Sequence, residues 1–486
     1  MEPREPATRW LPSLLLVVSV SSPVDMAAAA ERPRLFVLTD IGADPDDTQT
    51  LVRLLVYSNE IDIEGLAATT SMPQRTRVHP EMIREVLDAY GKVRANLCLH
   101  DPGYPTESAL ETLVTEGPAK YGMTGVGRRQ DSSASRALVR ALQKPDDRPL
   151  WVTAWGGSNV LAQALWTIRD TMSPDEASRL QAKLRVYTIS DQDDSGPWIR
   201  KEFRDVFYIV TPGGWGRATW TAMAKTMEGA DNESVTASWL AQNVQQGHGA
   251  LGAVYPDVAY GMEGDTPSWL GLIPNGLSNM EHPDWGGWGG RYELYVPELA
   301  PPDPHMPPGA EFRIPETRPI WTNAEDSFPP PVPPSPFATR PQNSIKPVKD
   351  NFVTLWRWRT PVQNDFAARM DWAIKSYSEA NHPPVASIAG PEAFTVHSGQ
   401  TFNLDASPSS DPDGDSLSFR WYQYPEAGSF DETISFQGKA SNLRTIHDLI
   451  APRVSKPKTA HIILEVTDKG TPPLTRYRRV IVEFVP

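Results

Sequence analysis

The sequence has a single cysteine, Cys98, among its 486 residues. An intrachain disulfide and a multi-cysteine metal site are therefore excluded, and Cys98 is interpreted as a small core residue because no base lies beside it. The sequence also lacks clustered lysine and arginine, and its formal net charge is −14. A protein that neutralises nucleic-acid phosphates needs such basic clusters, so we expect no nucleic-acid partner.

Long hydrophobic runs are missing as well, and no segment after the leader is long enough to span a membrane. The leader itself has Arg4 and Arg9 before the apolar run 10–18, followed by the small residues 27–30. This pattern predicts a signal peptide over residues 1–30, with a disordered leader or an uncleaved anchor as the alternatives. We expect a secreted or periplasmic protein without a membrane partner.

Strand-like and helix-like stretches alternate in the first part of the chain. Short apolar runs predict strands at residues 35–39, 63–69, 150–154, 184–189 and 207–210. Helical spacing of apolar residues predicts helices at 48–58, 80–90, 133–143, 157–171 and 366–377. Such βαβ repetition indicates an α/β domain over residues 31–380, with a mostly parallel sheet flanked by helices. The proline-rich stretch 299–346 is interpreted as a surface loop within it.

After the prolines at 383 and 384 the composition changes. Short alternating strands are predicted at 401–404, 418–422 and 461–466, separated by turn signals such as Asp413-Gly414. About one hundred residues of this kind predict an immunoglobulin-like β-sandwich over residues 383–486. Within it, the loop 410–415 is either a polar turn, which we favour, or a second calcium site.

Polar clusters follow three of the predicted strands of the first domain. They are residues 40–47, residues 154–159 with Asn159, and residues 190–194. Ligands of parallel sheets bind where the loops at the carboxyl ends of the strands converge. The three clusters are therefore expected to share one rim.

The first cluster places Asp40, Asp44, Asp46 and Asp47 within eight residues. Four mutually repelling carboxylates are costly unless a cation or dense hydrogen bonding compensates them. Ligation by oxygen alone favours calcium or magnesium over zinc. A helix N-terminus would account for Asp46 and Asp47, each stabilising the first turn by roughly 0.3–1 kcal/mol, but not for four acids.

This strand, acidic loop, helix and following strand (residues 62–70) resemble the start of the nucleoside hydrolase superfamily. The longer pattern Gly42-Ala43-Asp44-Pro45-Asp46-Asp47 is closer to a secreted branch described as cellulose-binding, with an N-terminal nucleoside-hydrolase-like domain and a C-terminal immunoglobulin-like domain. Further matching stretches are residues 191–198, 263–268, 282–292, 356–359 and 365–372. The resemblance to this branch covers about residues 34–486, and that to true nucleoside hydrolases only the first domain.

The resemblance implies a Ca²⁺ site with a specific set of ligands. Asp40 corresponds to the metal-bound aspartate that acts as general base, and Asp46 and Asp47 to the adjacent aspartate pair. The backbone carbonyl near Ala154 and the late aspartate Asp265 complete the set. The loop is two residues longer than in nucleoside hydrolases, so Asp44 has no assigned role. Asp265 follows Gly264 instead of a histidine, which argues against ribonucleoside hydrolysis.

Expected substrate contacts come from the later segments. The carboxylates of Asp191, Asp193 and Asp194 follow a strand, where they are either sugar-hydroxyl acceptors or part of a solvated turn. The tryptophans of the glycine-rich stretch 282–292 either stack on sugar rings or fill a tightly packed loop. The full set of expected substrate-binding residues is Asn159, Asp191, Asp193, Asp194, Trp198, Glu263, Trp285 and Trp288.

Together these features favour a calcium-dependent glycoside hydrolase-like protein that acts on a carbohydrate such as cellulose or on another glycoside. A non-catalytic polysaccharide-binding protein that retains the fold is the alternative, and a true nucleoside scavenger ranks last. The oligomeric state does not follow from the sequence.

Overall fold

A computed structural model describes residues 31–212, 218–299, 314–328, 347–434 and 442–486 of the chain. The predicted signal peptide and much of the proline-rich stretch, residues 300–313 and 329–346, lie outside the described residues. Residues Pro33–Pro486 belong to one unit. No helix within the described ranges is both long enough and apolar enough to cross a membrane.

The central sheet has eight strands in the order β3-β2-β1-β4-β5-β6-β8-β7. Their bounds are β1 (Arg34–Thr39), β2 (Asp62–Ala68), β3 (Val114–Glu116), β4 (Leu150–Ala154), β5 (Leu184–Thr188), β6 (Phe207–Val210), β7 (Tyr292–Tyr295) and β8 (Ile320–Asn323). All neighbouring pairs are parallel except β7–β8. The predicted mostly parallel sheet is confirmed.

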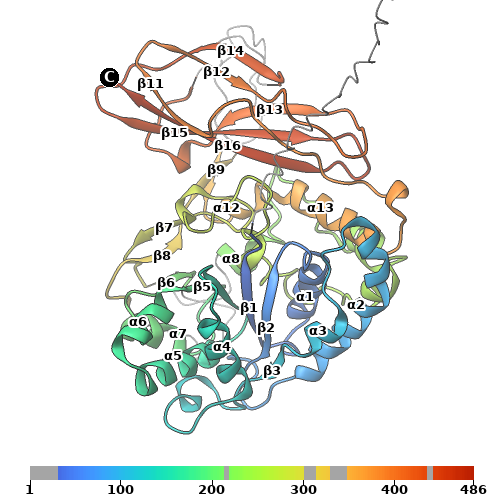
Figure 1. The fold of residues 1–486 in the computed structure, drawn as a ribbon, viewed down its shortest axis with the longest axis vertical. Coiled ribbons are helices and arrows are strands. Elements are labelled where there is room, and N and C mark those ends of the chain that lie inside the picture. Colours follow the sequence, from blue (N-terminus) through green and yellow to red (C-terminus); the bar gives the residue numbers. More distant parts are fainter. Residues whose placement is uncertain (1–30, 213–217, 300–313, 329–346, 435–441) are drawn as a thin grey trace, which may run out of the picture. The chain divides into compact units, whose positions relative to one another are not determined.

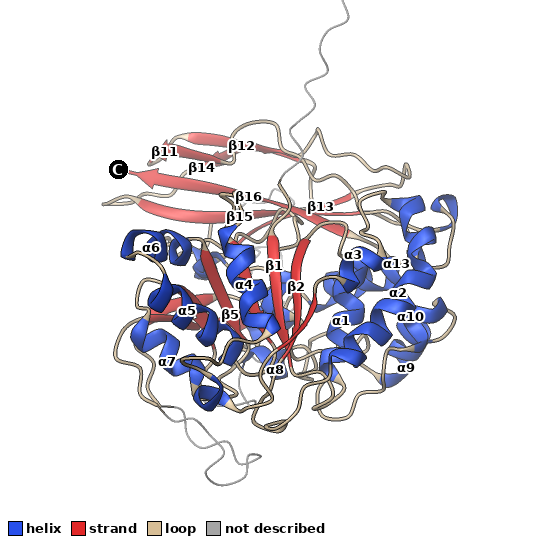
Figure 2. Cartoon of the chain, turned by 60° about the horizontal axis from the view of Figure 1, so that its bottom comes forward, coloured by secondary structure: helices blue, strands red, loops and turns tan. Residues whose placement is uncertain are grey.

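Helices cover both faces of this sheet (Figures 1 and 2). They are α1 (Asp46–Val56), α2 (Pro80–His100), α3 (Glu107–Glu111), α4 (Ser133–Gln143), α5 (Asn159–Thr171), α6 (Pro174–Ala182), α7 (Ser195–Glu202), α8 (Ala218–Ala222), α9 (Ala237–Leu240), α10 (Gly249–Ala253), α11 (Pro267–Leu270), α12 (Val353–Trp356) and α13 (Arg359–Trp372). Strand β1 is buried on both faces because its side chains alternate between two cores. Leu35 and Val37 belong to the core with α1, α2 and α13, and Phe36 and Leu38 to the core with α4 and α5.

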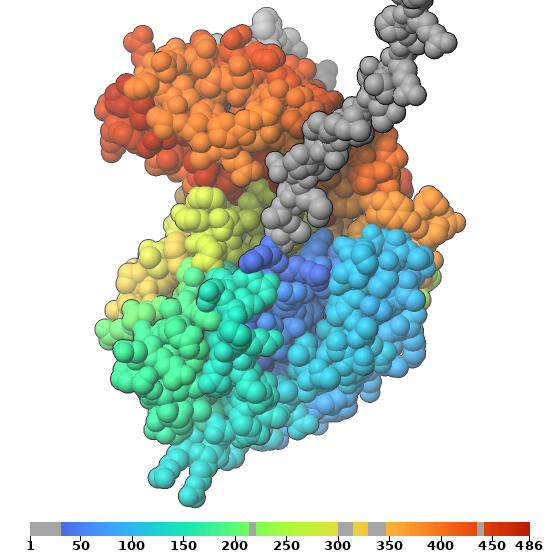
Figure 3. Space-filling view, in the orientation of Figure 1, coloured from blue at the N-terminus to red at the C-terminus, as the bar shows by residue number. Residues whose placement is uncertain are grey.

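Helix bounds differ from the sequence prediction mainly at their ends. Helix α2 extends ten residues beyond the predicted end at Tyr90, and its segment forms a broad part of the surface on the right of Figure 3. Helix α13 begins at Arg359, before the predicted start, because Trp358 and Val362 are already buried there. Helix α4 has the predicted bounds, with the Ser132 side chain accepting the N–H of Ser135 at its start.

The interpretation of residues 299–346 as a surface loop was wrong for its described part. Residues 320–323 form β8, which pairs with β6 and β7, and Ile320 is 1% exposed. Strand β9 (Asp326–Phe328) follows and pairs with β10 (Val348–Asp350). These strands have only three or four residues each, which is too few for an apolar pattern to show in the sequence.

The C-terminal region is all-β, as predicted. Its strands are β11 (Ala393–His397), β12 (Thr401–Asp405), β13 (Ser418–Gln423), β14 (Thr445–Ile450), β15 (Lys458–Thr467) and β16 (Thr475–Val485). They form a four-stranded sheet, β11-β16-β15-β13, and a two-stranded sheet, β12-β14. Alternating side chains such as Trp421, Ile462 and Val482 fill a core of their own, typical of a sandwich.

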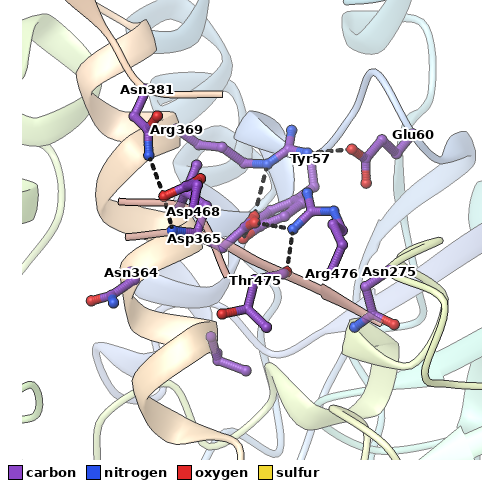
Figure 4. Close-up of polar contacts among 12 residues, drawn as sticks. Tyr57, Glu60, Asn275, Asn364, Asp365, Arg369, Asn381, Asp468, Thr475 and Arg476 are labelled. Carbon is purple, nitrogen blue, oxygen red and sulfur yellow. Dashed lines mark hydrogen bonds and ion pairs between the residues drawn. The ribbon is translucent and has the colours of Figure 1, made fainter. Parts of the chain in front are cut away.

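Buried polar contacts connect strand β16 of this sandwich to α13 (Figure 4). Asp365 accepts hydrogen bonds from Tyr57 at 2.8 Å, Arg369 at 3.2 Å and Arg476 at 2.6 Å. The pKa of Asp365 is lowered, because Arg476 and Arg369 outweigh the burial that by itself raises it. One carboxylate thus joins α1, α13 and β16.

Candidate metal and glycoside site

The sheet has a topological switch point between β1 and β4. From β1 the chain continues to β2 and β3 on one side, and from β4 to β5 and β6 on the other. The carboxyl ends of strands at such a point form a crevice that binds ligands in open α/β sheets. Asp40 directly follows β1, and Gly156 lies two residues after β4.

The acidic loop after β1 folds its carboxylates together. One carboxylate oxygen each of Asp44, Asp46 and Asp47 lie within 4.8 Å of one another. Asp46 and Asp47 are the first residues of α1 and are at most 3% exposed, as is Asp40. The N–H of Asp46 donates to Asp44 Oδ1 at 3.1 Å, so Asp44 is held against the start of the helix.

Asp265 reaches the same cluster from the segment before α11. It is 1% exposed, and its Oδ2 has no hydrogen-bond partner among the described residues. Burial raises the pKa of Asp265, and so do the negative charges of Asp46, Asp47, Asp40 and Asp44. The structure therefore brings Asp40, Asp46, Asp47 and Asp265 together and adds Asp44, to which the sequence assigned no role.

The electrostatics of this cluster are unfavourable without a counter-charge. Burial raises the pKa of Asp40 to about 7. The pKa values of Asp46 and Asp47 are also raised, first by burial and then by their acidic neighbours. No lysine or arginine within the described ranges forms an ion pair with any of these aspartates.

Neighbouring side chains fix the orientation of the carboxylates. Thr39 donates its hydroxyl to Asp47 Oδ1, and the Trp220 indole N–H donates to Asp46 Oδ2 at 2.6 Å. The Asp40 side chain packs against Gly156, where a Cβ would be 2.6 Å from it. Trp220 and Gly156 were not predicted. The glycines of the Trp155-Gly156-Gly157 stretch could have indicated a close approach of another side chain. No local pattern could have indicated Trp220, because it lies 174 residues from its hydrogen-bond partner Asp46.

Ala154 ends β4 and pairs with Leu38 of β1. Its carbonyl oxygen accepts the N–H of Ile189 at 3.2 Å, so one of its two lone pairs is used by the sheet. The predicted ligand atom thus retains one lone pair.

Asn159 follows β4 and Asp193 follows β5, so both come from loops at the carboxyl ends of these parallel strands. Asp193 packs on Gly157, where a Cβ would be 2.3 Å from its Oδ2. That Oδ2 has no partner within the described part of the chain, and burial raises the pKa of Asp193 to about 6. Asn159 is fully buried and donates to Thr70 Oγ1 at 3.1 Å, leaving its Oδ1 without a donor among the residues described.

Four other predicted contact residues are engaged elsewhere. Glu263 is fully buried between Arg53, Tyr255 and Thr266. Asp191 forms a bidentate ion pair with Arg200, with N–O distances of 2.7 and 2.8 Å. Asp194 Oδ1 accepts the N–H of Met123 at 2.8 Å. Trp198 packs edge-on against Phe203 under the Arg169 guanidinium.

The tryptophans of the glycine-rich stretch pack within the protein. Trp288 is 1% exposed and meets Tyr477 edge-on. Trp285 stacks on His282, with ring centroids 4.2 Å apart, and its edge meets His461 of β15. Of the two alternatives for this stretch, the structure favours the packed loop.

The donor set fits a calcium ion. The side chains of the cluster offer only oxygen ligands, Asp265 Oδ2 lacks a donor among the described residues, and a cation would offset the repulsion of the three clustered carboxylates. Calcium accepts six to eight such oxygens in irregular geometry.

An aspartate cluster at the switch point of a mostly parallel sheet defines an α/β protein with a candidate metal site. Two family models match the chain: "Cellulose-binding Sde182, nucleoside hydrolase-like domain" over residues 34–292, and "Cellulose-binding protein Sde0182, C-terminal domain" over residues 401–484. The chain therefore belongs to this family of cellulose-binding proteins with a nucleoside-hydrolase-like domain, and the predicted resemblance is confirmed.

Among solved structures, the chain is similar to a nucleoside hydrolase-related protein from Saccharophagus degradans that is described as associated with carbohydrate metabolism. The two share 35% sequence identity with a TM-score of 0.77, over 93% of this chain and 100% of that chain. No curated protein matches the sequence.

Proposed function

We propose that this chain is a secreted, calcium-dependent protein that binds a carbohydrate at the switch-point crevice and hydrolyses a glycosidic bond there. The observation that supports this proposal most directly is the cluster of Asp44 with the buried Asp46 and Asp47, together with Asp265 Oδ2, which has no hydrogen-bond partner among the described residues. Cellulose is the first substrate to test, because the family description names it.

Asp46, Asp47 and Asp265 are the proposed metal ligands, with Asp44 as a further candidate and the Ala154 carbonyl as a neutral one. When bound, calcium supplies acidification of water and chelation of vicinal sugar hydroxyls. Asp40 would accept the proton of the attacking water, as a general base positioned by its contact with Gly156. Asp193 and Asn159 offer oxygens without donors among the described residues, which suits sugar hydroxyl groups.

Binding without hydrolysis is the second candidate function. It is favoured by the family description, which names cellulose binding. The same cluster and calcium would then bind and orient the saccharide without hydrolysing it.

A release assay separates the two. Full-length mature protein is incubated with cello-oligosaccharides and, separately, with nucleosides, with calcium or with a chelator. Calcium-dependent release of reducing sugar that is abolished in Asp40→Asn supports the hydrolase. Retention on insoluble cellulose without release of any product supports the binding protein. If wild type and an Asp46→Asn/Asp47→Asn variant show the same release and retention, the crevice is not the functional site.

A further inference from the structure

A second set of acidic residues lies in the loops of the β-sandwich, far in sequence from the crevice. The loop 410–415 carries Asp411, Asp413 and Asp415, and the turn after β15 carries Asp468. The sequence left the first loop open between a polar turn and a calcium site. Its hydrogen bonds now distinguish between these possibilities.

Asp411 uses only one of its carboxylate oxygens in the loop. Its Oδ1 accepts the N–H groups of Asp413 and Asp415, both at 2.9 Å. These two bonds form the turn that was expected. Its Oδ2 is buried and has no hydrogen-bond partner among the described residues. A polar turn explains Oδ1 and leaves Oδ2 unexplained.

Asp468 shows the same division. Its Oδ1 accepts from the N–H groups of Gly470 and Leu474 at 3.0 and 2.9 Å, and from Asn381 Nδ2 at 3.2 Å (Figure 4). Its Oδ2 is buried without a partner within the described part of the chain, and the residue is 2% exposed. Burial raises the pKa of Asp468, and the negative charge of Asp411 raises it further.

The segment Asn381–His382 holds the two loops together. Asn381 binds Asp468, while the N–H and ring Nδ1 of His382 lie 2.7 and 3.0 Å from the carboxylate of Asp413. The backbone and side chain of His382 thus both contact the carboxylate of Asp413. Within the described ranges, no lysine, arginine or histidine forms an ion pair with Asp411 or Asp468.

A cation would compensate two buried carboxylate oxygens that lack donors among the described residues and whose charges repel. We propose that Asp411 Oδ2 and Asp468 Oδ2 bind a second calcium ion, with the amide oxygen of Asn381 as a neutral candidate ligand. Calcium is favoured over magnesium because these ligands come from irregular loops, whereas magnesium requires near-octahedral geometry.

The location gives this ion a structural consequence. Asn381 follows the α13 region, while Asp411 and Asp468 belong to loops of the sandwich. The ion would link three segments that are distant in the sequence. This inference is independent of the crevice site.

Calcium binding to the full mature chain tests the proposal, by calorimetry and by thermal unfolding in calcium and in chelator. The experiment uses an Asp46→Asn/Asp47→Asn background, so that loss of the crevice site does not affect the outcome. In this background one calcium should still bind and raise the Tm. Adding Asp411→Asn or Asp468→Asn should abolish both effects, whereas adding Asp431→Asn, at an exposed carboxylate, should preserve them.

The chelator arm separates metal binding from a purely structural role. Each asparagine keeps an oxygen for the loop N–H groups and removes a repelling charge. In chelator, the Tm of Asp468→Asn should therefore equal or exceed that of its parent. A lower Tm in chelator with an unchanged calcium response assigns Asp468 to the turn alone and overturns the proposal. Equal calcium stoichiometry with and without Asp411→Asn also overturns it.

Discussion

The indole N–H of Trp220, in α8, donates to Asp46 Oδ2 at 2.6 Å. The same ring packs on Gly264, where a Cβ would lie 2.1 Å from it, next to Asp265. Trp220 thus contacts both chain segments that supply carboxylates to the crevice, and it orients Asp46 with a hydrogen bond to a charged acceptor.

Replacing Trp220 with phenylalanine should therefore weaken calcium binding at the crevice. Loss of a hydrogen bond that orients a ligand typically costs about 10–100-fold in metal affinity, and we expect about 10-fold here. Calorimetry on wild type and Trp220→Phe measures the change. Trp198→Phe is the matched control, because its ring packs on Phe203, and its affinity should equal that of wild type. Equal affinities for all three proteins would contradict the orienting role.

The raised pKa values predict an unusual pH dependence for the metal-free protein. Folding raises the pKa of Asp40 to about 7, and those of Asp46, Asp47 and Asp265 are raised as well. The folded state then binds more protons than the unfolded state between about pH 4 and 7, so stability falls as pH rises through this window.

Thermal unfolding of protein freed of metal on a chelating resin checks this expectation. Its Tm should be higher at pH 5 than at pH 7.5, and saturating calcium should remove most of the loss at pH 7.5. The Asp46→Asn/Asp47→Asn variant should show a weaker pH dependence without calcium. A metal-free Tm that rises from pH 5 to 7.5 in wild type, but not in this variant, would be incompatible with a buried, repelling cluster.

The local part of the site was predictable from the sequence, and the distant part was not. Asp40, Asp46 and Asp47 follow a strand within eight residues, so their convergence needs only one turn. Asp265 was placed only through the family resemblance. Glu263 has its nearest charged partner, Arg53, 210 residues away, and its ion pair left no local pattern.

The glycine-rich stretch 282–292 shows why composition alone could not distinguish tryptophans that stack on sugar rings from tryptophans in a packed loop. Both need tryptophan and glycine. The decisive contacts, those of Trp288 with Tyr477 and of Trp285 with His461, come from the sandwich, more than 170 residues further along the chain. The strands of the alternating strand and helix segments were predictable, whereas β8 lies in a proline-rich stretch and was missed.

Gly156 is predicted to be essential for the position of Asp40. An alanine Cβ would lie 2.6 Å from Asp40 Cβ and Oδ1, so the carboxylate must move. Overpacking of this kind costs about 1–3 kcal/mol, and calcium affinity should fall by at least about 10-fold. Calorimetry measures the affinity, and urea unfolding measures the stability.

Gly125→Ala is the control for this change, since its Cβ would meet Pro118 at 3.0 Å, away from the acidic loop. It should bind calcium as wild type does. A Gly156→Ala protein that is less stable but keeps wild-type affinity would show that Asp40 does not depend on this contact.

The ion pair between Asp365 and Arg476 is predicted to be the main polar contribution of β16 to its contact with α13. The two side chains are 3% and 11% exposed, and their atoms are 2.6 Å apart. Replacing Arg476 with methionine keeps the apolar stem but leaves the buried carboxylate with one cation fewer, which should cost about 3 kcal/mol of unfolding free energy. Arg478→Met is the matched control on the same strand, because Arg478 pairs with the exposed Glu392 at 3.5 Å and should cost less than about 1 kcal/mol. Urea unfolding in saturating calcium compares the two, and similar losses would show that the buried pair has no special role in joining the sandwich to α13.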